Sequence, residues 1–160
     1  MRGIKHSFIL DDTYNASPES MRAALETLQA LPGRRKVAVL GDMLELGTYT
    51  EGAHRAIGDT AAKFADMLFC VGARAKFIAD EAILRGLDRE KVFYFDDSPA
   101  AGRALDPVIR EGDLILVKGS QGMRMERVVE EIIADPQRAE ELLVRQEAYW
   151  RRTSPWSVLI

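Results

Sequence analysis

Two adjacent carboxylates, an aromatic ring and an amide follow the first apolar run of the chain, within FILDDTYNASPES. The flanks of this stretch have a clear structural role: the apolar run is typical of a buried strand, and Ser17 before Pro18 predicts a helix N-cap. Folding does not explain the four side chains between them, Asp11, Asp12, Tyr14 and Asn15. Because carboxylates accept hydrogen bonds and an amide both donates and accepts, these residues could hold a small polar ligand.

Two later segments also combine ionisable side chains with glycine. GDMLELG contains Asp42 and Glu45, and KGSQG contains Lys118 and Ser120. A lysine in a glycine-rich turn can meet an anionic group, since glycine lets the backbone approach a ligand closely. Loops are often polar and glycines often end strands, so each segment taken alone is equally consistent with an ordinary loop.

The elements that must position these residues alternate along the chain. Short apolar runs predict buried strands, and longer amphipathic runs predict helices. The strands are expected at 8–11, 36–40, 67–71, 92–95 and 114–117, and the helices at 18–31, 51–65, 74–85, 98–110 and 123–134. Pro107 is expected to interrupt the fourth helix. Strands separated by helices run parallel with right-handed crossovers, which predicts an α/β fold: a doubly wound, mostly parallel sheet with helices on both faces.

Such a sheet brings the polar segments to one edge. The loops after all five strands begin at the carboxyl ends of the strands, where open parallel sheets bind their ligands. The loop after the fourth strand contributes another carboxylate pair, Asp96 and Asp97. Five converging loops, two with adjacent carboxylates and one with a lysine, favour a binding site over a set of ordinary loops.

Composition excludes several classes of function. The chain has 160 residues, 47% hydrophobic and 29% charged, with a net charge of -3, so a compact fold is expected and a basic nucleic-acid or membrane surface is not. The single Cys70 permits neither an internal disulfide framework nor a cysteine-based zinc site, and no other metal ligands are predicted. We find no apolar run of about 18 residues and no signal-peptide pattern, so a cytoplasmic location is expected.

Three long segments resemble one known family. DDTYNASPESMRAALETL, VAVLGDMLELG with the following Glu51-x-x-His54, and LVKGSQGMRMERVV are similar to the C-terminal domain of Mur ligases of the MurF type. These are ATP-dependent enzymes that add D-alanyl-D-alanine to UDP-MurNAc-tripeptide. The resemblance covers residues 4–133 in the family's order and spacing, so we expect a Rossmann-like domain at 1–135. Residues 136–160 are expected to form a charged helical tail that packs on the body, with contact to another domain or subunit as the alternative.

The resemblance implies an acyl phosphate mechanism in peptidoglycan synthesis, and hence roles in cell wall biogenesis, cell shape and cell division. The partners it implies are ATP, UDP-MurNAc-tripeptide, D-alanyl-D-alanine and the N-terminal and central domains. The central domain of the family holds the ATP phosphates and Mg²⁺, and this chain contains no G-x-x-x-x-G-K-[ST] phosphate loop. We therefore expect the 160 residues to be part of a longer enzyme and to be inactive alone.

The resemblance also assigns the opening residues. The family's aspartate after the first strand holds the ATP ribose, which corresponds to Asp12, with Asp11 as its neighbour. A carboxylate suits this role because it can accept from two vicinal hydroxyls in charge-assisted hydrogen bonds. Tyr14 and Asn15 are expected beside the adenine or the ribose edge. The alternative for Asp11 is a carboxylate that caps the turn.

On the substrate side, the resemblance implies four residues around D-alanyl-D-alanine: Asp42, Glu45, Lys118 and Ser120. The two acids could orient the attacking amine or could simply fix their loop. Lys118 could neutralise the dipeptide carboxylate or remain solvated at the mouth of the cleft. His54 is expected to be a packed, hydrogen-bonded residue, while Arg124 and Arg127 are expected on a solvated helix face. No residue of this domain is assigned as catalytic.

Two alternatives stay open. Another Mur or folylpolyglutamate-type ligase domain would share the sheet and the ribose aspartate, but it would have His where this chain has Asn15 and would lack GDMLELG. A stand-alone nucleotide-binding module would use the same crevice as a sensor.

Overall fold

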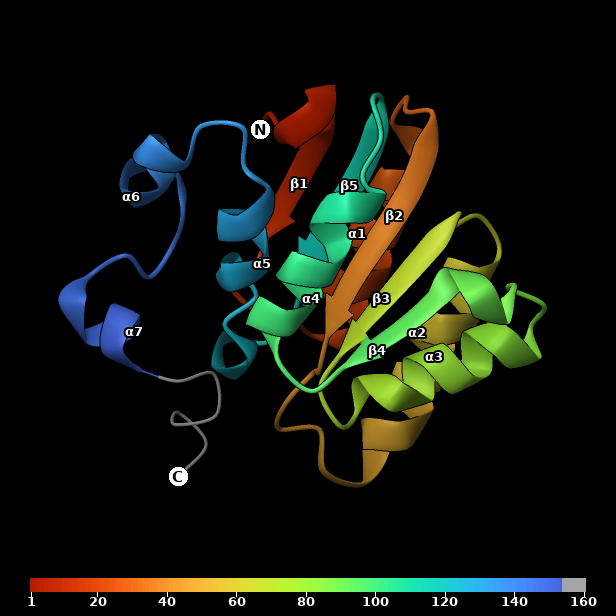
Figure 1. The fold of residues 1–160 in the computed structure, drawn as a ribbon. Coiled ribbons are helices and arrows are strands. Elements are labelled where there is room, and N and C mark those ends of the chain that lie inside the picture. The colour runs from red at the N-terminus through yellow and green to blue at the C-terminus, as the bar shows by residue number, and fades with distance from the viewer. Residues whose placement is uncertain (154–160) are drawn as a thin grey trace.

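A five-stranded parallel sheet forms the centre of the computed structural model, which describes residues 1–153 (Figure 1). The strands are β1 (Phe8–Asp12), β2 (Arg35–Gly41), β3 (Met67–Val71), β4 (Val92–Phe95) and β5 (Asp113–Lys118). The helices are α1 (Pro18–Ala30), α2 (Thr50–Ala62), α3 (Ala75–Leu84), α4 (Ser98–Leu105), α5 (Glu126–Ile132), α6 (Ala139–Leu142) and α7 (Ala148–Arg152). None of the helices within residues 1–153 is both long and apolar enough to span a bilayer.

The strand order is β1-β5-β2-β3-β4, with every neighbouring pair parallel. The chain moves in one direction from β1 to β4, and α1, α2 and α3 therefore cover the same face, because each crossover is right-handed. After β4 the chain reverses direction and inserts β5 between β1 and β2. This reversal puts α4 and α5 on the opposite face, so the predicted doubly wound α/β sheet is confirmed.

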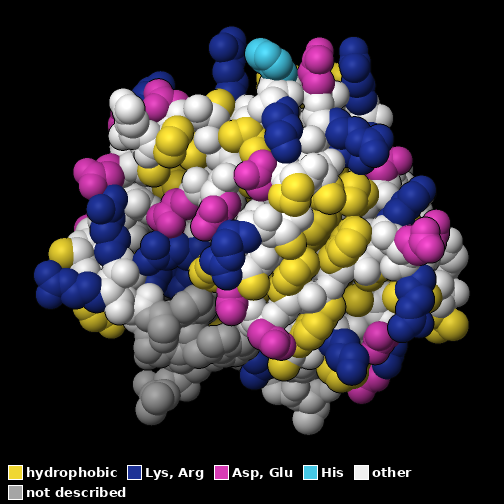
Figure 2. Space-filling view, viewed as in Figure 1, with side chains coloured by type: hydrophobic (Ala, Val, Ile, Leu, Met, Phe, Trp, Pro, Cys, Tyr) yellow, Lys and Arg dark blue, Asp and Glu magenta, His cyan; other side chains and the backbone are white. Residues whose placement is uncertain are grey.

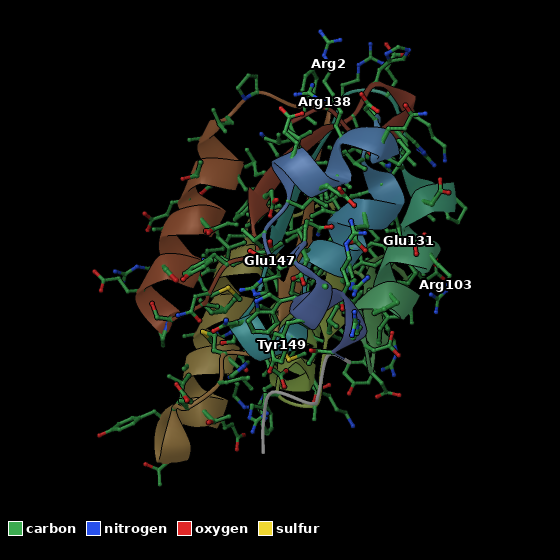
Figure 3. The ribbon with its side chains drawn as sticks, turned by 90° about the vertical axis from the view of Figure 1, so that its left-hand side faces the viewer. Arg2, Arg103, Glu131, Arg138, Glu147 and Tyr149 are labelled. Carbon is green, nitrogen blue, oxygen red and sulfur yellow. The ribbon has the colours of Figure 1, made fainter. Side chains whose placement is uncertain are left out.

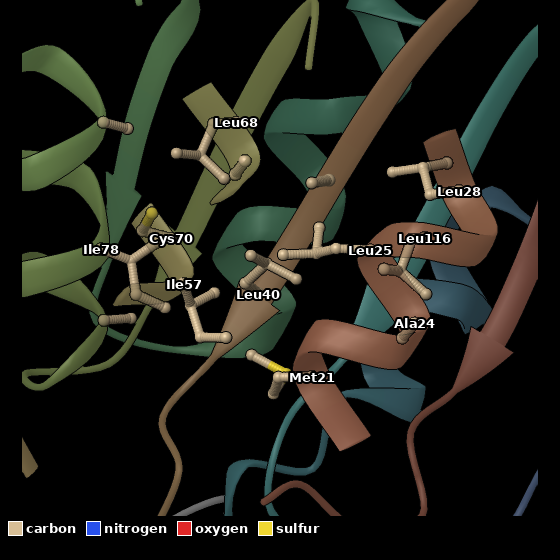
Figure 4. Close-up of a cluster of buried hydrophobic side chains, with 14 of the residues drawn as sticks. Met21, Ala24, Leu25, Leu28, Leu40, Ile57, Leu68, Cys70, Ile78 and Leu116 are labelled. Atoms are coloured by element: carbon tan, nitrogen blue, oxygen red, sulfur yellow. The ribbon is translucent and has the colours of Figure 1, made fainter. Parts of the chain in front are cut away.

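Each face of the sheet carries its own apolar cluster. The first lies under α1, α2 and α3 and includes Met21, Leu25, Leu40, Leu68 and Leu116 (Figure 4). The second lies under α4 and α5 and includes Ile9, Val39, Phe69, Ile115 and Val128. Strand residues alternate between the two clusters, because successive side chains of a strand point to opposite faces. On the second face, apolar side chains reach the surface beside α4, where Phe93 and Phe95 of β4 are only partly buried (Figure 2).

Local sequence explains where most helices begin and end. Ser17 and Ser20 form a reciprocal capping box at the start of α1, and Pro18 occupies the first turn, as predicted. Helix α4 ends at Leu105 and continues as a short 3-10 turn that contains Pro107, which confirms the predicted interruption. The start of α5 was predicted too early, because Arg124 has a left-handed backbone with φ 52° and the helix begins only at Glu126.

The C-terminal segment, residues 136–153, crosses the side of the molecule next to α5 (Figures 1 and 3). Leu143 is buried in the second cluster, and Arg145 pairs with Glu126 of α5. Trp150 lies beside the guanidinium groups of Arg124 and Arg145. The division into a domain at 1–135 and a tail at 136–160 stays a prediction, and Trp156 with the last apolar residues lies outside the described part of the chain.

Candidate functional site

A cleft of about 370 Å³ opens at the carboxyl ends of β1, β5 and β2. It is lined by three loops, which contribute Asn15 to Ser17, Leu44 to Leu46 and Ser120 to Gly122. The loop after β5 connects to a helix on one face of the sheet, while the loops after β1 and β2 connect to helices on the other. The cleft is therefore the topological switch point, where open α/β sheets bind ligands.

Ser120 joins the three loops at the base of this cleft. Its hydroxyl accepts a hydrogen bond from the backbone N–H of Leu44 at 2.9 Å and donates to the carbonyl of Ala16 at 3.3 Å. Its own N–H donates to the carbonyl of Asp42 at 2.9 Å. Ser120 is 4% exposed, so in this structure its hydroxyl positions the loops around the cleft.

Lys118 is buried, which contradicts the alternative that it remains solvated at the mouth of the cleft. It is 2% exposed, and its Nζ lies 2.7 Å from Asp12 Oδ2 and 2.8 Å from the carbonyl oxygen of Asn15. The reason is the strand order, which places β5 between β1 and β2 and so surrounds the end of the strand with their loops. Its contact with a dipeptide carboxylate remains a proposal.

Asp12 keeps an accessible carboxylate next to that lysine. Its side chain is 48% exposed, and one of its oxygens contacts Lys118. A buried cation behind an exposed carboxylate fixes the carboxylate's orientation and leaves it open to solvent on the other side. Asp12 is therefore placed so that it can accept hydrogen bonds from the hydroxyl groups of a ligand.

Asp11 has a different environment. Its Oδ1 accepts from the hydroxyl of Thr13 at 2.7 Å and from the N–H of the same residue at 3.2 Å. Burial raises the pKa of Asp11, while the two hydrogen bonds from Thr13 lower it. This geometry is an Asx-type turn, and it favours the turn-capping alternative over ligand contact.

Asp42 is completely buried and serves the start of α3. Its Oδ1 accepts from the backbone N–H groups of Arg74 and Ala75 at 2.9 and 2.7 Å, and its Oδ2 lies 3.3 Å from Arg74 Nη1. Gly72 has φ 103°, and a Cβ there would meet Asp42 Oδ1 at 2.6 Å, so glycine permits this contact. Burial raises the pKa of Asp42, and the hydrogen bonds from Ala75 and Arg74 oppose that rise. The geometry favours the loop-fixing alternative for this acid.

His54 is packed and hydrogen-bonded, in agreement with its expected role. Its Nε2 accepts from the N–H of Met43 at 3.0 Å, and its Nδ1 lies 2.6 Å from the carbonyl of Thr50. These partners require the neutral tautomer with the proton on Nδ1. Burial lowers the pKa of His54, so the ring fixes the GDMLELG loop to α2 as a neutral group.

Tyr14 faces a second cavity, of about 600 Å³, next to the cleft. Tyr14 is 68% exposed, and the centroid of its ring lies 5.6 Å from the guanidinium carbon of Arg145. Trp150 lines the cavity from the C-terminal segment, and Gln121 lines both this cavity and the cleft. Gln121 belongs to the KGSQG segment, whereas no local pattern in the sequence points to Arg145.

Arg124 is also buried, so the expected solvated face is wrong for this residue. It is 1% exposed, and its Nε lies 2.5 Å from Glu126 Oε1. Its left-handed backbone turns the side chain inward before α5 begins, which a helical wheel starting at residue 123 could not predict. Arg127 is partly exposed and pairs with Glu130 at 3.1 Å.

The structure thus divides the eight predicted site residues into four groups. Asn15, Glu45 and Ser120 line the cleft. Lys118 and Asp42 lie buried beneath the loops, while Tyr14 lines the neighbouring cavity. Asp11 and Asp12 line a shallow hollow at the β1 edge, beside Ala24 and Thr27 of α1.

The described residues do not fit a metal site of their own. Within residues 1–153, no three His, Cys, Asp or Glu side chains gather closely enough to coordinate an ion. Asp12 already contacts Lys118, and Asp42 is enclosed by Arg74 and the start of α3. A Mg²⁺ ion that accompanies a nucleotide would therefore need its protein ligands from elsewhere.

The chain belongs to the Mur ligase family, because the family described as "Mur ligase, glutamate ligase domain" matches residues 1–121. Several relatives that match about four fifths of this chain share one description. The UDP-N-acetylmuramoyl-tripeptide--D-alanyl-D-alanine ligase of Bacillus subtilis is 38% identical over 130 residues, which cover 80% of this chain and 28% of the relative.

Solved structures agree with this result. The crystal structure of MurF ligase from Thermotoga maritima in complex with ADP superposes with a TM-score of 0.65 at 29% identity, covering 87% of this chain and 30% of that one. Crystal structure I of MurF from Acinetobacter baumannii gives a TM-score of 0.63 at 34% identity, covering 77% and 26%. The chain thus spans less than a third of the length of these relatives, and the resemblance inferred from the three segments is confirmed.

Proposed function

We propose that this chain is the C-terminal domain of an ATP-dependent ligase that joins D-alanyl-D-alanine to UDP-MurNAc-tripeptide in peptidoglycan synthesis. The observation that carries this proposal is the cleft at the switch point of the sheet, which is lined by the loops after β1, β2 and β5. These are the loops that contain the three family-like segments. The reaction would take place in the cytoplasm, where ATP is available.

The proposed reaction has two steps. The tripeptide carboxylate first attacks the γ-phosphorus of ATP, which forms an acyl phosphate and releases ADP. The amine of D-alanyl-D-alanine then attacks the acyl carbon, so that a C–N bond forms, the C–O bond to phosphate breaks and inorganic phosphate leaves with a proton released from the amine. Mg²⁺ and the phosphate-binding groups would come from the central domain.

The residues of this chain would bind and orient the reactants. Asp12 would accept hydrogen bonds from the ribose hydroxyls, with Lys118 behind it holding the carboxylate in place. Asn15 and Tyr14 would lie beside the nucleotide. Glu45 is exposed at the rim of the cleft and could accept a hydrogen bond from the dipeptide amine, whereas Ser120, Asp42 and Lys118 would hold the loops that form the pocket.

The test is a coupled assay on the longer polypeptide that contains this chain. Phosphate release should require UDP-MurNAc-tripeptide, ATP and D-alanyl-D-alanine together, and mass spectrometry should detect the pentapeptide product. Release of phosphate with a single amino acid but never with the dipeptide would instead identify a different ligase of the family. Nucleotide binding without any ligation would favour the sensor module.

A further inference from the structure

A buried charge network joins α5 to the C-terminal segment outside the cleft. Glu126 is fully buried and contacts two arginines, Arg124 at 2.5 Å and Arg145 at 3.0 Å. One carboxylate therefore faces two buried cations, and the network contains an excess of positive charge. Buried charge is costly unless polar groups surround it, so the second arginine needs further acceptors.

Arg145 obtains those acceptors from the loop after β1. The residue is 6% exposed, and its Nη1 donates to the carbonyl of Thr13 at 3.0 Å as well as to Glu126. Its Nη2 donates to the carbonyl of Tyr14. Among the described residues Nε has no hydrogen-bond partner, so the two terminal nitrogens make all of these contacts.

Two buried cations thus hold three consecutive carbonyl groups. Arg145 binds the carbonyls of Thr13 and Tyr14, and Lys118 binds the carbonyl of Asn15. Apart from the Asp11 turn, the loop has little regular hydrogen bonding of its own between β1 and the Ser17 cap. The carbonyls of this loop point inward because the two cations lie beneath it.

We propose that Arg145 is a positioning residue, which holds the Thr13–Asn15 backbone so that Asp12, Tyr14 and Asn15 are arranged for a nucleotide. The nucleotide part of this inference rests on the proposed function. In this proposal Arg145 acts through the loop and not by touching a substrate. Glu126 in turn orients the guanidinium group of Arg145. The ring centroids of Tyr14 and Trp150 lie 5.6 and 5.8 Å from the carbon of this guanidinium.

The first experiment measures the loop directly, with backbone ¹⁵N relaxation of the 160-residue chain. In the wild type the order parameters of Tyr14 and Asn15 should be close to the rigid value of about 0.85, and in Arg145→Gln they should fall below about 0.6. Those of β2 and β3 should not change. Arg145→Lys keeps the charge beside Glu126 but donates from one nitrogen, so it should give an intermediate value.

The matched control is Arg138→Gln. Arg138 lies in the same segment, toward the opposite end from Tyr149 (Figure 3). Its side chain forms an ion pair with the exposed Glu141 and with no other carboxylate of residues 1–153. This variant should leave the loop rigid. If Arg145→Gln does not fold, Arg145→Lys carries the same measurement. An unchanged loop in a folded Arg145 variant would overturn the proposal.

The second experiment measures steady-state kinetics in the longer polypeptide. Arg145→Gln should raise the KM for ATP by about tenfold, with a smaller effect on kcat and on the KM for the dipeptide, because the loop must be ordered when the nucleotide binds. Arg145→Lys should recover part of this loss. A mobile loop with an unchanged KM for ATP would overturn the nucleotide part. If the wild type shows no ligation, the proposed function fails, and the relaxation data still decide whether Arg145 holds the loop.

Discussion

At the scale of single residues, the polar groups at the carboxyl edge of the sheet each join two or three parts of the chain. His54 connects α2 to Met43, Asp42 connects β2 to α3, and Ser120 connects all three loops of the cleft. Each of these side chains is buried and hydrogen-bonded, as buried polar groups must be. Asp12 differs because half of its side chain remains exposed.

The first prediction separates the two neighbouring aspartates. Asp12→Asn keeps the shape of the side chain and an oxygen for Lys118. It should weaken the proposed hydrogen bonds from ribose by about 1.5–3 kcal/mol, or roughly 10- to 150-fold in kcat/KM for ATP. Asp11→Asn should change kcat/KM little, because Asp11 is engaged with Thr13. The measurements are steady-state kinetics of the longer polypeptide and melting temperatures. Equal and small kinetic effects from both variants would show that the pair is structural.

The Asn substitution is preferred to Ala for a structural reason. Asp12→Ala would leave Lys118 buried without its carboxylate, and removing one partner of such a pair is destabilising. A loss of activity in that variant could then come from a disturbed loop. Asp12→Asn limits this effect, and circular dichroism would show whether the fold is kept.

The second prediction concerns pH. Burial holds the pKa of His54 below its ordinary value of about 6.5, so the unfolded chain takes up a proton before the folded one does. The free energy of unfolding should therefore fall as the pH drops from about 6.5 toward the lowered pKa of the folded state. Well above a pH of about 6.5, His54 should not make the free energy of unfolding depend on pH. Asp42 raises this pKa and Arg74 lowers it, but desolvation is the larger effect.

The check is urea unfolding at several pH values. His54→Gln should be less stable throughout and should show a shallower slope below pH about 6.5. His6→Gln is the control, since His6 is exposed. An identical slope in the wild type and in His54→Gln would contradict the proposed protonation state.

At the scale of the elements, α2 and α3 form the closest helix pair on their face of the sheet. Gly58 makes this approach possible, because a Cβ at this position would lie 2.4 Å from the carbonyl oxygen of Ile78 and 2.9 Å from the Cβ of Glu81. The pair matters for the site, since α2 carries His54 and the start of α3 is held by Asp42. Their spacing therefore affects the GDMLELG loop.

The third prediction tests this contact with two glycines of the same helix. Gly58→Ala should destabilise the chain by about 1–3 kcal/mol, because the helices must separate to admit the methyl group. Gly52→Ala should be neutral or stabilising by up to about 1 kcal/mol, since a Cβ there meets nothing within 4 Å and alanine favours the helix. Chemical unfolding of both variants is the measurement. Equal effects would exclude a close-packing role for Gly58.

At the scale of the whole molecule, the described chain would form one side of the proposed ligand site. The cleft and the hollow with Asp12 are open to solvent, and the sequence contains no phosphate loop. The relatives are more than three times as long as the matched region. The remaining contacts to a triphosphate would have to come from other domains.

The fourth prediction follows from this openness. The 160-residue chain should unfold cooperatively, should show no ATPase or ligase activity, and should bind ATP with a Kd of about 1 mM or weaker. Isothermal titration calorimetry with ATP tests the affinity, with Asp12→Asn as the control for ribose contact. A micromolar Kd for the isolated chain would contradict this prediction, because it would mean that residues of this chain bind the phosphates as well.

The sequence alone determined the strands, most helix boundaries, the doubly wound topology and the family. Strand interiors are apolar on both faces, Ser17 and Pro18 mark a helix start, and Pro107 marks a helix end, all of which are local signals. The edge on which the loops gather follows from parallel strand direction. The strands and helix ends can be predicted from the sequence because each depends on residues a few positions apart.

Only the tertiary structure decided which polar residues are buried and what they contact. One alternative left Lys118 solvated at the mouth of the cleft, yet it is enclosed because β5 lies between β1 and β2. Arg145 contacts Thr13 across 132 residues of sequence, so no local pattern could reveal it. Burial and pairing depend on elements that meet only after folding, and this is why the residues that hold the cleft in shape were hidden while the loops that line it were visible.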